Sequence, residues 1–287
     1  MIREKLTIAS LRNYLRDNLA TLYPERELNA IIKILTLHIS KKDNTFILTH
    51  PDHEISSYTW FKVNKIVDDL KKMRPLQYIC GISEFFGLPF LVNEHTLIPR
   101  QETEELVDLI IRDNRDKTPV ILDIGTGSGC IAISLALNIG NSQVSATDNS
   151  QAVIKVAAGN AKRNGVLINF IVDDILNPDT GKYGKYDLVV SNPPYITESE
   201  KEHMEKKVLD YEPHKALFVP DDDPLLFYRS VMELCTRVLL KDGYLYLEIN
   251  ETKGRDMRDL MLSYGYRDTE LIKDINGKTR IIKGRKG

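Results

Sequence analysis

Apolar residues recur at helical spacing through the first 75 residues. Three segments place most of their apolar side chains on one face of a helix: 1–20, 25–40 and 56–73. Short amphipathic helices bury such faces against one another. Residues 1–75 are therefore predicted to form a small helical bundle, and they contain no combination of side chains typical of a catalytic site.

From residue 100 onward, helical spacing alternates with short apolar runs that read as strands. These runs are 119–125, 143–148, 168–174, 186–192 and 244–249. A final segment, 269–284, reads as a hairpin that turns at Asn276-Gly277 and would put one antiparallel strand at an edge of the sheet. Alternation of this kind predicts an α/β fold, a mostly parallel sheet with helices on both faces.

The segment between these two parts has a third character. Residues 76–99 are rich in aromatic and β-branched side chains, interrupted by glycine and proline. This composition predicts a β-hairpin. The chain is thus expected to consist of a bundle at 1–75, a hairpin linker at 76–99 and a larger domain at 100–287.

A glycine-rich turn follows the first strand of the larger domain. The sequence VILDIGTGSGCIAI runs from an apolar strand through five turn residues into a helix. Glycine lets the backbone turn tightly and approach a ligand, and the helix presents free N–H groups to that ligand. The turn residues are candidates for cofactor binding: Gly125, Thr126, Gly127, Ser128 and Gly129.

Acidic residues at the ends of the next two strands indicate which cofactor. Asp148 stands 19 residues after Gly129, where a carboxylate accepts hydrogen bonds from both ribose hydroxyls of a nucleoside. Asp173 and Asp174 end the following strand, where a side chain can read an adenine amino group. No lysine that could bind phosphate follows the glycines. A ligand with adenosine and no pyrophosphate therefore fits, namely S-adenosylmethionine, and a nicotinamide dinucleotide is the alternative.

A rigid corner, Asn192-Pro193-Pro194-Tyr195, follows the fourth strand. Proline has φ fixed at about −65° and no N–H to donate, and the residue before it is pushed toward an extended conformation. The corner therefore presents free carbonyls, one amide side chain and one aromatic ring. Ligands bind at the carboxyl ends of strands in open α/β sheets, so the corner, the glycine turn and Asp148 are expected to meet in one crevice.

Composition excludes several classes of protein. No run of 18 apolar residues predicts a membrane span, and the N-terminal residues lack the apolar core of a signal peptide. The three cysteines lie far apart and the six histidines show no ligand spacing, so neither a disulfide framework nor a metal site is expected. Proteins that bind nucleic acid directly usually carry a large positive charge. The net charge here is −2, with +4 in residues 1–75, so direct binding of nucleic acid is not expected. A cytoplasmic protein is expected.

Together these motifs resemble a known family. A GxGxG turn combined with Asn-Pro-Pro-Tyr marks class I methyltransferases that act on nitrogen conjugated with a planar group. The segment PLQYICGISEFFGLPFLVNEHTLIPRQETEELVD, followed by DIGTGSGCIAI, TDNS, SNPPYI, YEPHKAL and KDINGKTRIIKG, is similar to release factor glutamine methyltransferases. The resemblance covers about the whole chain. It implies a Rossmann-like seven-stranded class I methyltransferase sheet with a C-terminal antiparallel hairpin, plus the N-terminal bundle.

The resemblance also implies a reaction and its cofactor. Members of this family transfer a methyl group from S-adenosylmethionine to the N5 atom of the glutamine in the Gly-Gly-Gln motif of class 1 peptide chain release factors. Carried over by position, the turn 125–129, Asp148 and Asn192 would hold the cofactor. Asp174 and Ile175 would border its adenine.

The corner would then do the chemistry. Asn192, Pro193 and Tyr195 are the implied catalytic residues, and with Pro194 they would hold the substrate amide. The bundle, which lacks catalytic residues of its own, is expected to recognise the release factor as a protein partner.

Some features depart from the family pattern, and other functions stay open. Gln101 replaces the usual proline, Asn250 stands where a glycine follows Glu-Ile, and the acidic triple 221–223 is unusual. An adenine-N6 methyltransferase acting on DNA or RNA carries the same corner but usually adds a basic groove. An adaptor with a vestigial methyltransferase fold is the alternative outside enzymes, and the intact glycine turn and corner argue against it.

Overall fold

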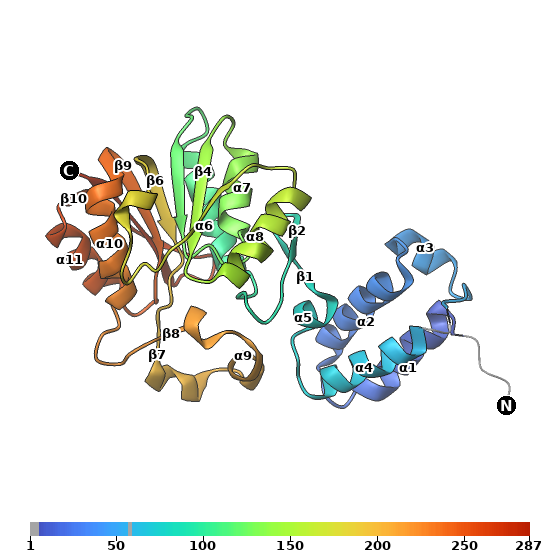
Figure 1. Ribbon diagram of the computed structural model, residues 1–287. Helices are drawn as coiled ribbons and strands as arrows, with labels where there is room; N and C mark the ends of the chain where they lie inside the picture. Colours follow the sequence, from blue (N-terminus) through green and yellow to red (C-terminus); the bar gives the residue numbers. More distant parts are fainter. Residues whose placement is uncertain (1–5, 57–58) are drawn as a thin grey trace. The chain divides into compact units, whose positions relative to one another are not determined.

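The structure is a computed structural model that describes residues 6–56 and 59–287. Contacts divide the chain into two units, Met1–Gly81 and Ile82–Gly287 (Figure 1). Across the described ranges, no helix is long and apolar enough to span a membrane.

The first unit is helical, as its apolar spacing predicts. Its helices are α1 (Ile8–Leu19), α2 (Glu25–Ser40), α3 (Asn44–Thr49), α4 (Thr59–Lys71) and α5 (Leu76–Cys80). Helix α2 has the predicted bounds, whereas residues 1–5 and 57–58 of the other predicted helices lie outside the described part of the chain. The apolar stripes of α1, α2 and α4 form one core, and the hydroxyl of Tyr23 bonds the Leu70 carbonyl beneath it over 2.8 Å.

The predicted hairpin at 76–99 is shorter than expected. Residues 76–80 form α5, because Pro75 starts a helical turn and Gly81, at φ 67°, ends it. The hairpin itself consists of β1 (Ile82–Phe85) and β2 (Leu88–Leu91). Its turn residues Phe86 and Gly87 both have positive φ, which matches the twist of a tight two-residue turn.

The second unit is built on a seven-stranded sheet. The strands are β3 (Val120–Ile124), β4 (Gln143–Asp148), β5 (Asn169–Val172), β6 (Tyr186–Ser191), β9 (Leu239–Glu248), β10 (Tyr266–Lys273) and β11 (Thr279–Lys286), in the order β10-β11-β9-β6-β3-β4-β5. The first five are parallel, and β11 is antiparallel to both of its neighbours. The reversed strand of the final hairpin thus lies between β9 and β10 and is not the edge strand.

Helices cover both faces of this sheet (Figure 1). They are α6 (Gln101–Asp113), α7 (Cys130–Asn138), α8 (Gln151–Arg163), α10 (Leu226–Val238) and α11 (Gly254–Ser263). Helices α6, α7 and α8 pack on one face, with Ile121, and α10 and α11 on the other, with Leu122. Successive side chains of β3 therefore pack into two different apolar cores, one on each face of the sheet. The predicted α/β fold class is confirmed.

The segment between β6 and α10 is irregular. It holds β7 (Ile196–Thr197), β8 (Phe218–Val219) and α9 (Lys206–Tyr211), with short 3-10 turns η2 (Glu198–His203) and η3 (His214–Ala216); a further turn, η1 (Thr180–Lys182), precedes β6. These elements are too short to leave a periodic pattern in the sequence. The buried Glu212 accepts a hydrogen bond from Arg100 over 2.6 Å and one from the Ile98 amide over 3.4 Å. This carboxylate ties the segment to the residues that enter α6.

Asn160 on α8 fixes the hairpin against the glycine turn. Its side chain is fully buried, and its amide nitrogen donates to the Ser128 carbonyl over 2.8 Å and to the Leu91 carbonyl over 2.9 Å. Its oxygen accepts from the Leu91 amide over 2.6 Å. One side chain thus connects α8, β2 and the turn between β3 and α7.

Replacement of Asn160 by alanine is expected to lower the free energy of unfolding by about 1–3 kcal/mol, because buried backbone groups lose their partners. Urea denaturation measures the change. The matched control is Asn164→Ala, one helical turn later, whose side chain makes a single bond to the hairpin, at the Pro89 carbonyl. A loss in Asn160→Ala no greater than in the control would contradict this role.

Candidate functional site

The predicted site lies at the carboxyl ends of neighbouring parallel strands. Strands β6, β3 and β4 are adjacent in the sheet, so the residues that follow them meet at one edge. Ser191 donates to the Ile124 carbonyl over 2.7 Å, and the Gly127 amide donates to Asp148 Oδ2 over 3.1 Å. The structure therefore brings the glycine turn, Asp148 and the corner at Asn192 to the same edge.

The glycine turn needs glycine for two different reasons. Gly125, Gly127 and Gly129 all have positive φ, of 73°, 55° and 83°. A Cβ at Gly129 would approach Ile133 to 3.0 Å and Ala157 to 3.2 Å, so close packing of α7 on α8 excludes a side chain there. At the other two glycines a Cβ would meet no protein atom within 4 Å. Their backbone is open to the close approach of a ligand.

The Asp148 carboxylate lies beside this turn and bonds its backbone. One carboxylate oxygen accepts from the Gly127 amide, and the other accepts from the Ser150 amide over 3.2 Å. Each oxygen has a second lone pair, so the carboxylate keeps acceptor capacity for two hydroxyls. Burial raises the pKa of Asp148, although these amide hydrogen bonds oppose that rise. The residues present fit the ribose of an adenosine cofactor.

A second carboxylate, Asp123, lies beneath the turn and was not singled out from the sequence. Its side chain is fully buried, and Oδ2 accepts from the Thr126 hydroxyl over 2.7 Å and from the Ala132 amide over 3.3 Å. No residue in the described part of the chain bonds Oδ1. Burial, and to a lesser degree the nearby Asp148, raises the pKa of Asp123 to about 7. Asp123 could have been recognised from the sequence, because it is a carboxylate inside an otherwise apolar strand.

Asp173 and Asp174, which follow β5, have different surroundings. Asp173 is buried and bonded to Lys182, to the Tyr183 hydroxyl and to the Asp179 amide, so it stabilises the loop. Asp174 is exposed, and its carboxylate accepts from the Leu176 amide over 3.0 Å. The Asp173 amide donates to the Asp148 carbonyl over 3.1 Å, so this pair lies beside the end of β4. Ile175, also expected to border adenine, is half-buried against the core of the α10 face.

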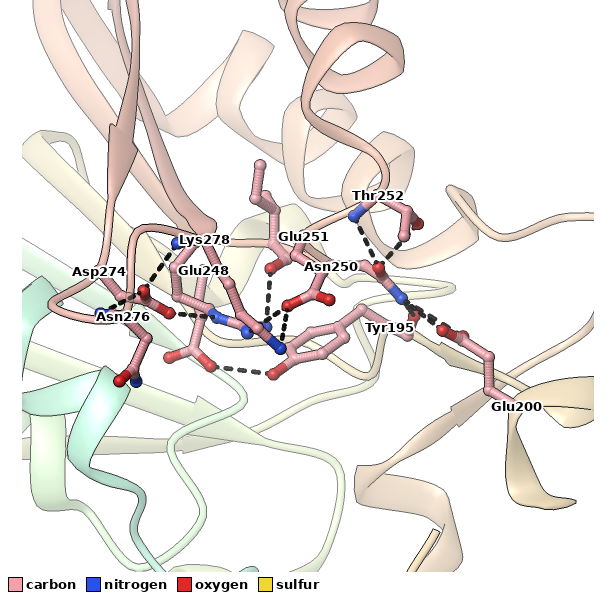
Figure 2. Close-up of polar contacts among 11 residues, drawn as sticks. Tyr195, Glu200, Glu248, Asn250, Glu251, Thr252, Asp274, Asn276 and Lys278 are labelled. Carbon is pink, nitrogen blue, oxygen red and sulfur yellow. Dashed lines mark hydrogen bonds and ion pairs between the residues drawn. The ribbon is translucent and has the colours of Figure 1, made fainter. Parts of the chain in front are cut away.

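The corner is held by a short chain of hydrogen bonds. Asn192 Nδ2 donates to the Thr103 hydroxyl over 3.1 Å, and that hydroxyl donates to Glu248 Oε2 over 2.7 Å. The Tyr195 hydroxyl donates to Glu248 Oε1 over 3.1 Å (Figure 2). Pro193 is buried, whereas Asn192 and Pro194 are half-buried. Helix α6, strand β9 and the corner are therefore joined through one carboxylate.

This carboxylate is buried, and its tyrosine partner is half-buried. Glu248 is 1% exposed, and burial raises its pKa against the hydrogen bonds from Thr103 and Tyr195. Burial and the neighbouring Glu248 raise the pKa of Tyr195, so its hydroxyl stays protonated and donates at neutral pH. Glu248 ends β9 at the same edge as the other site residues. It could have been predicted from the sequence, because site residues in such sheets follow the carboxyl ends of parallel strands. Thr103 lies on a helix, so its position in the sequence does not indicate a place in the site.

Asn250, which departs from the family pattern, is bonded on both sides of its amide. Its nitrogen donates to the Tyr195 carbonyl over 3.3 Å and to Glu200 over 3.1 Å, and its oxygen accepts from the amide and hydroxyl of Thr252 (Figure 2). Glu200 in turn accepts from the Thr197 amide over 2.7 Å. Asn250 thereby connects the loop after β9 to the backbone of the corner. The departures Gln101 and 221–223 lie at exposed or half-buried positions.

Metal-ligand geometry does not occur in the part of the chain that the structure covers. Among residues 6–56 and 59–287, no group of three His, Cys, Asp or Glu side chains could hold an ion. Cys80, Cys130 and Cys235 are free thiols. Burial raises the pKa of Cys80 to about 11, so that thiol is protonated at neutral pH.

Two family models match the chain, one in each unit. The PrmC N-terminal domain matches residues 10–81, and the methyltransferase small domain matches residues 103–211. The release factor glutamine methyltransferase of Flavobacterium psychrophilum is 43% identical over 282 residues, which cover 97% of this chain and 99% of that protein. The protein of the same name from Bacteroides thetaiotaomicron is 43% identical over 269 residues, with 94% and 96% covered.

A solved structure supports the fold. A methyltransferase from Pyrococcus furiosus has a TM-score of 0.54 to this chain at 18% identity, and the alignment covers 76% of this chain and 99% of that one.

The raised pKa of Asp123 predicts a pH dependence of stability. Between about pH 4 and pH 7 the Asp123 carboxyl has lost its proton in the unfolded chain and keeps it in the folded chain, so the contribution of Asp123 to the free energy of unfolding falls by about 1.4 kcal/mol per pH unit. Asn at this position cannot titrate. The difference in unfolding free energy between wild type and Asp123→Asn should therefore decrease from pH 4 to pH 7 and level off above it. Urea denaturation across this range measures it, and parallel curves would contradict the assignment.

Proposed function

We propose that this chain, which belongs to the release factor glutamine methyltransferase family, methylates the glutamine of the Gly-Gly-Gln motif in class 1 peptide chain release factors. The methyl group comes from S-adenosylmethionine, and the acceptor is the N5 atom of the side-chain amide. The observation that carries this proposal is the corner at Asn192. Its amide nitrogen is engaged by Thr103, so its oxygen is left to accept from a planar NH₂ group.

The glycine turn and Asp148 hold the cofactor. The open backbone at Gly125 and Gly127 receives the ligand, and the remaining lone pairs of Asp148 accept from ribose hydroxyls. Thr126, Ser128 and Gly129 complete the turn, and Asp174 with Ile175 borders the adenine. When bound, S-adenosylmethionine supplies an electrophilic methyl group.

The corner positions the substrate nitrogen. An amide nitrogen is a poor nucleophile, because its lone pair is delocalised into the carbonyl. The Asn192 oxygen and the Pro193 carbonyl each accept one N–H of the glutamine NH₂, and Tyr195 packs on the amide plane beside Pro194. Positive charge grows on nitrogen as the methyl group transfers, so the two oxygens stabilise the transition state more than the ground state. Methyl transfer leaves the nitrogen with an extra proton, and an amide protonated on nitrogen is very acidic. That proton is lost to water after the transfer, so no strong general base is needed first.

The relatives that match nearly the whole chain are named for glutamine methylation, and this disfavours the other functions considered. An adenine-N6 methyltransferase, a nicotinamide enzyme and a vestigial adaptor have no comparable support. A release factor works in translation, so the chain acts in the cytoplasm on a protein partner and needs no direct contact with nucleic acid.

The helical bundle at 1–75 recognises the release factor, and 100–287 carries cofactor binding and chemistry. This division rests first on the place of the candidate site residues, since the glycine turn, Asp148 and the corner all lie in the second unit. The bundle in turn has large apolar side chains on its surface. Phe61 on α4 is 78% exposed and Leu48 at the end of α3 is 63% exposed. Aromatic residues such as Phe61 are enriched at the centres of protein interfaces.

The reaction is tested directly by incubating the protein with a class 1 release factor and S-adenosylmethionine that carries a labelled methyl group. Mass mapping should place one methyl group on the glutamine of Gly-Gly-Gln. A matched release factor with Asn in place of that glutamine should stay unlabelled. Label on another residue, or on DNA or RNA added in place of the protein, would overturn the proposal.

Asn192→Ala is expected to lower kcat by about 10²–10³, by analogy with the loss of one preorganised oxyanion partner. The affinity for S-adenosylmethionine, measured by calorimetry, should fall by no more than a few-fold. Asn192 is one implied cofactor contact among several, and the glycine turn and Asp148 remain, whereas the lost oxygen is the acceptor for the substrate amide. Asn169→Ala, at an exposed position of β5, is the control and should keep the wild-type kcat. A folded Asn192→Ala variant with wild-type kcat would show that Asn192 does not take part in the reaction.

Phe61→Ala is expected to raise KM for the intact release factor about five- to thirtyfold, since truncating an anchor costs on the order of 1–2 kcal/mol. The affinity for S-adenosylmethionine should not change. Leu167→Ala is the matched control, because Leu167 is 97% exposed on the other unit. Equal KM values in the two variants would mean that the α4 surface does not bind the substrate.

A further inference from the structure

Glu248 makes an unusual set of contacts for a fully buried carboxylate. Its two oxygens accept from two hydroxyls, that of Thr103 over 2.7 Å and that of Tyr195 over 3.1 Å. The positive charge of Arg280 on β11 acts on Glu248, yet its guanidinium bonds the Ile249 carbonyl and pairs with Glu251 and Asp274. A buried charge without a direct cationic partner costs folding free energy. Folding stability therefore does not explain why a carboxylate occupies this position.

The chemistry of hydroxyls gives that reason. Thr103 has one hydroxyl proton and donates it to Glu248, so its oxygen faces Asn192 as an acceptor only. The Asn192 amide must then turn its NH₂ toward Thr103. The opposite orientation would set two acceptor oxygens against each other. No donor among residues 6–56 and 59–287 bonds Asn192 Oδ1 in the structure.

We propose that Glu248 and Thr103 are positioning residues that select the orientation of the Asn192 amide, and that Glu248 fixes Tyr195 on the other side of the same corner. This inference rests on the proposed function, since it assigns how the corner presents an acceptor oxygen to the substrate NH₂. A carboxylate is suited to the task because it accepts from both hydroxyls at once. A glutamine would offer one acceptor and one donor, and one of the two hydroxyls would have to turn.

The first test removes the hydroxyl of Thr103. Thr103→Val keeps the shape of the side chain and leaves Asn192 without an acceptor, so either orientation of its amide becomes accessible. We expect kcat with release factor to fall about 10²-fold, as for other losses of alignment at a reacting centre. The affinity for S-adenosylmethionine should not change. Thr103→Ser restores a hydroxyl at the same atom and should recover most of the activity.

The second test needs no release factor. In wild type, the side-chain NH₂ protons of Asn192 should exchange slowly with water in amide NMR spectra, assigned by their absence in Asn192→Ala. Exchange should become faster in Thr103→Val and return in Thr103→Ser. This measurement separates the two proposals: wild type that fails to methylate release factor contradicts the proposed function, whereas unchanged exchange in Thr103→Val contradicts the positioning role.

Tyr228→Phe is the matched control for Tyr195→Phe. Both remove a buried tyrosine hydroxyl bonded to Glu248, but Tyr228 bonds the backbone carbonyl over 3.2 Å and Tyr195 the carboxylate. Tyr195→Phe should lower kcat, and Tyr228→Phe should lower only the melting temperature. Wild-type kcat in folded Thr103→Val, or equal losses of kcat in the two tyrosine variants, would overturn the proposal.

Discussion

The order of strands in the sheet is the constraint on which the whole site depends. Because β9, β6, β3 and β4 are neighbours and run in the same direction, their carboxyl ends fall on one edge. A glycine turn, a carboxylate and a proline corner that are separated by up to 70 residues of sequence therefore become neighbours. The apolar alternation along each strand, which feeds a core on either face, holds this edge in place.

Within this frame, the corner is fixed from several directions. Prolines restrict its backbone, Glu248 and Thr103 reach its side chains, and Asn250 bonds its Tyr195 carbonyl. Asn250 stands where the family pattern has glycine, which has no side chain to make that bond. In this chain the loop after β9 thus contributes a contact that a glycine cannot supply, and it links the corner to the capped turn at Glu200.

Sequence patterns identified two kinds of feature. One is the helices and strands whose apolar residues repeat regularly, and the other is the site residues that directly follow the carboxyl ends of strands. The bounds of α2 and the strand that ends at Asp148 were predicted directly, because each is a single local pattern. Asp123 and Glu248 were not predicted, although each is a carboxylate in an apolar strand, because their roles depend on burial, which the sequence does not show directly. Thr103 could not be found, because its role depends on a contact 145 residues away in the sequence. The segment after the corner was missed for a different reason: its elements have two to six residues.

The place of β11 has a consequence for how the sheet folds. Ile281 on β11 lies opposite Glu248 on β9, so the strand that carries the central carboxylate depends on a neighbour from a distant part of the sequence. Without β11, that side of β9 would be an open edge with unpaired backbone groups, able to pair with other chains. Pairing between strands that are far apart in sequence is slow compared with helix formation, because the intervening chain must first close into a loop. The surroundings of Glu248 are therefore expected to become native only after β9 and β11 have paired.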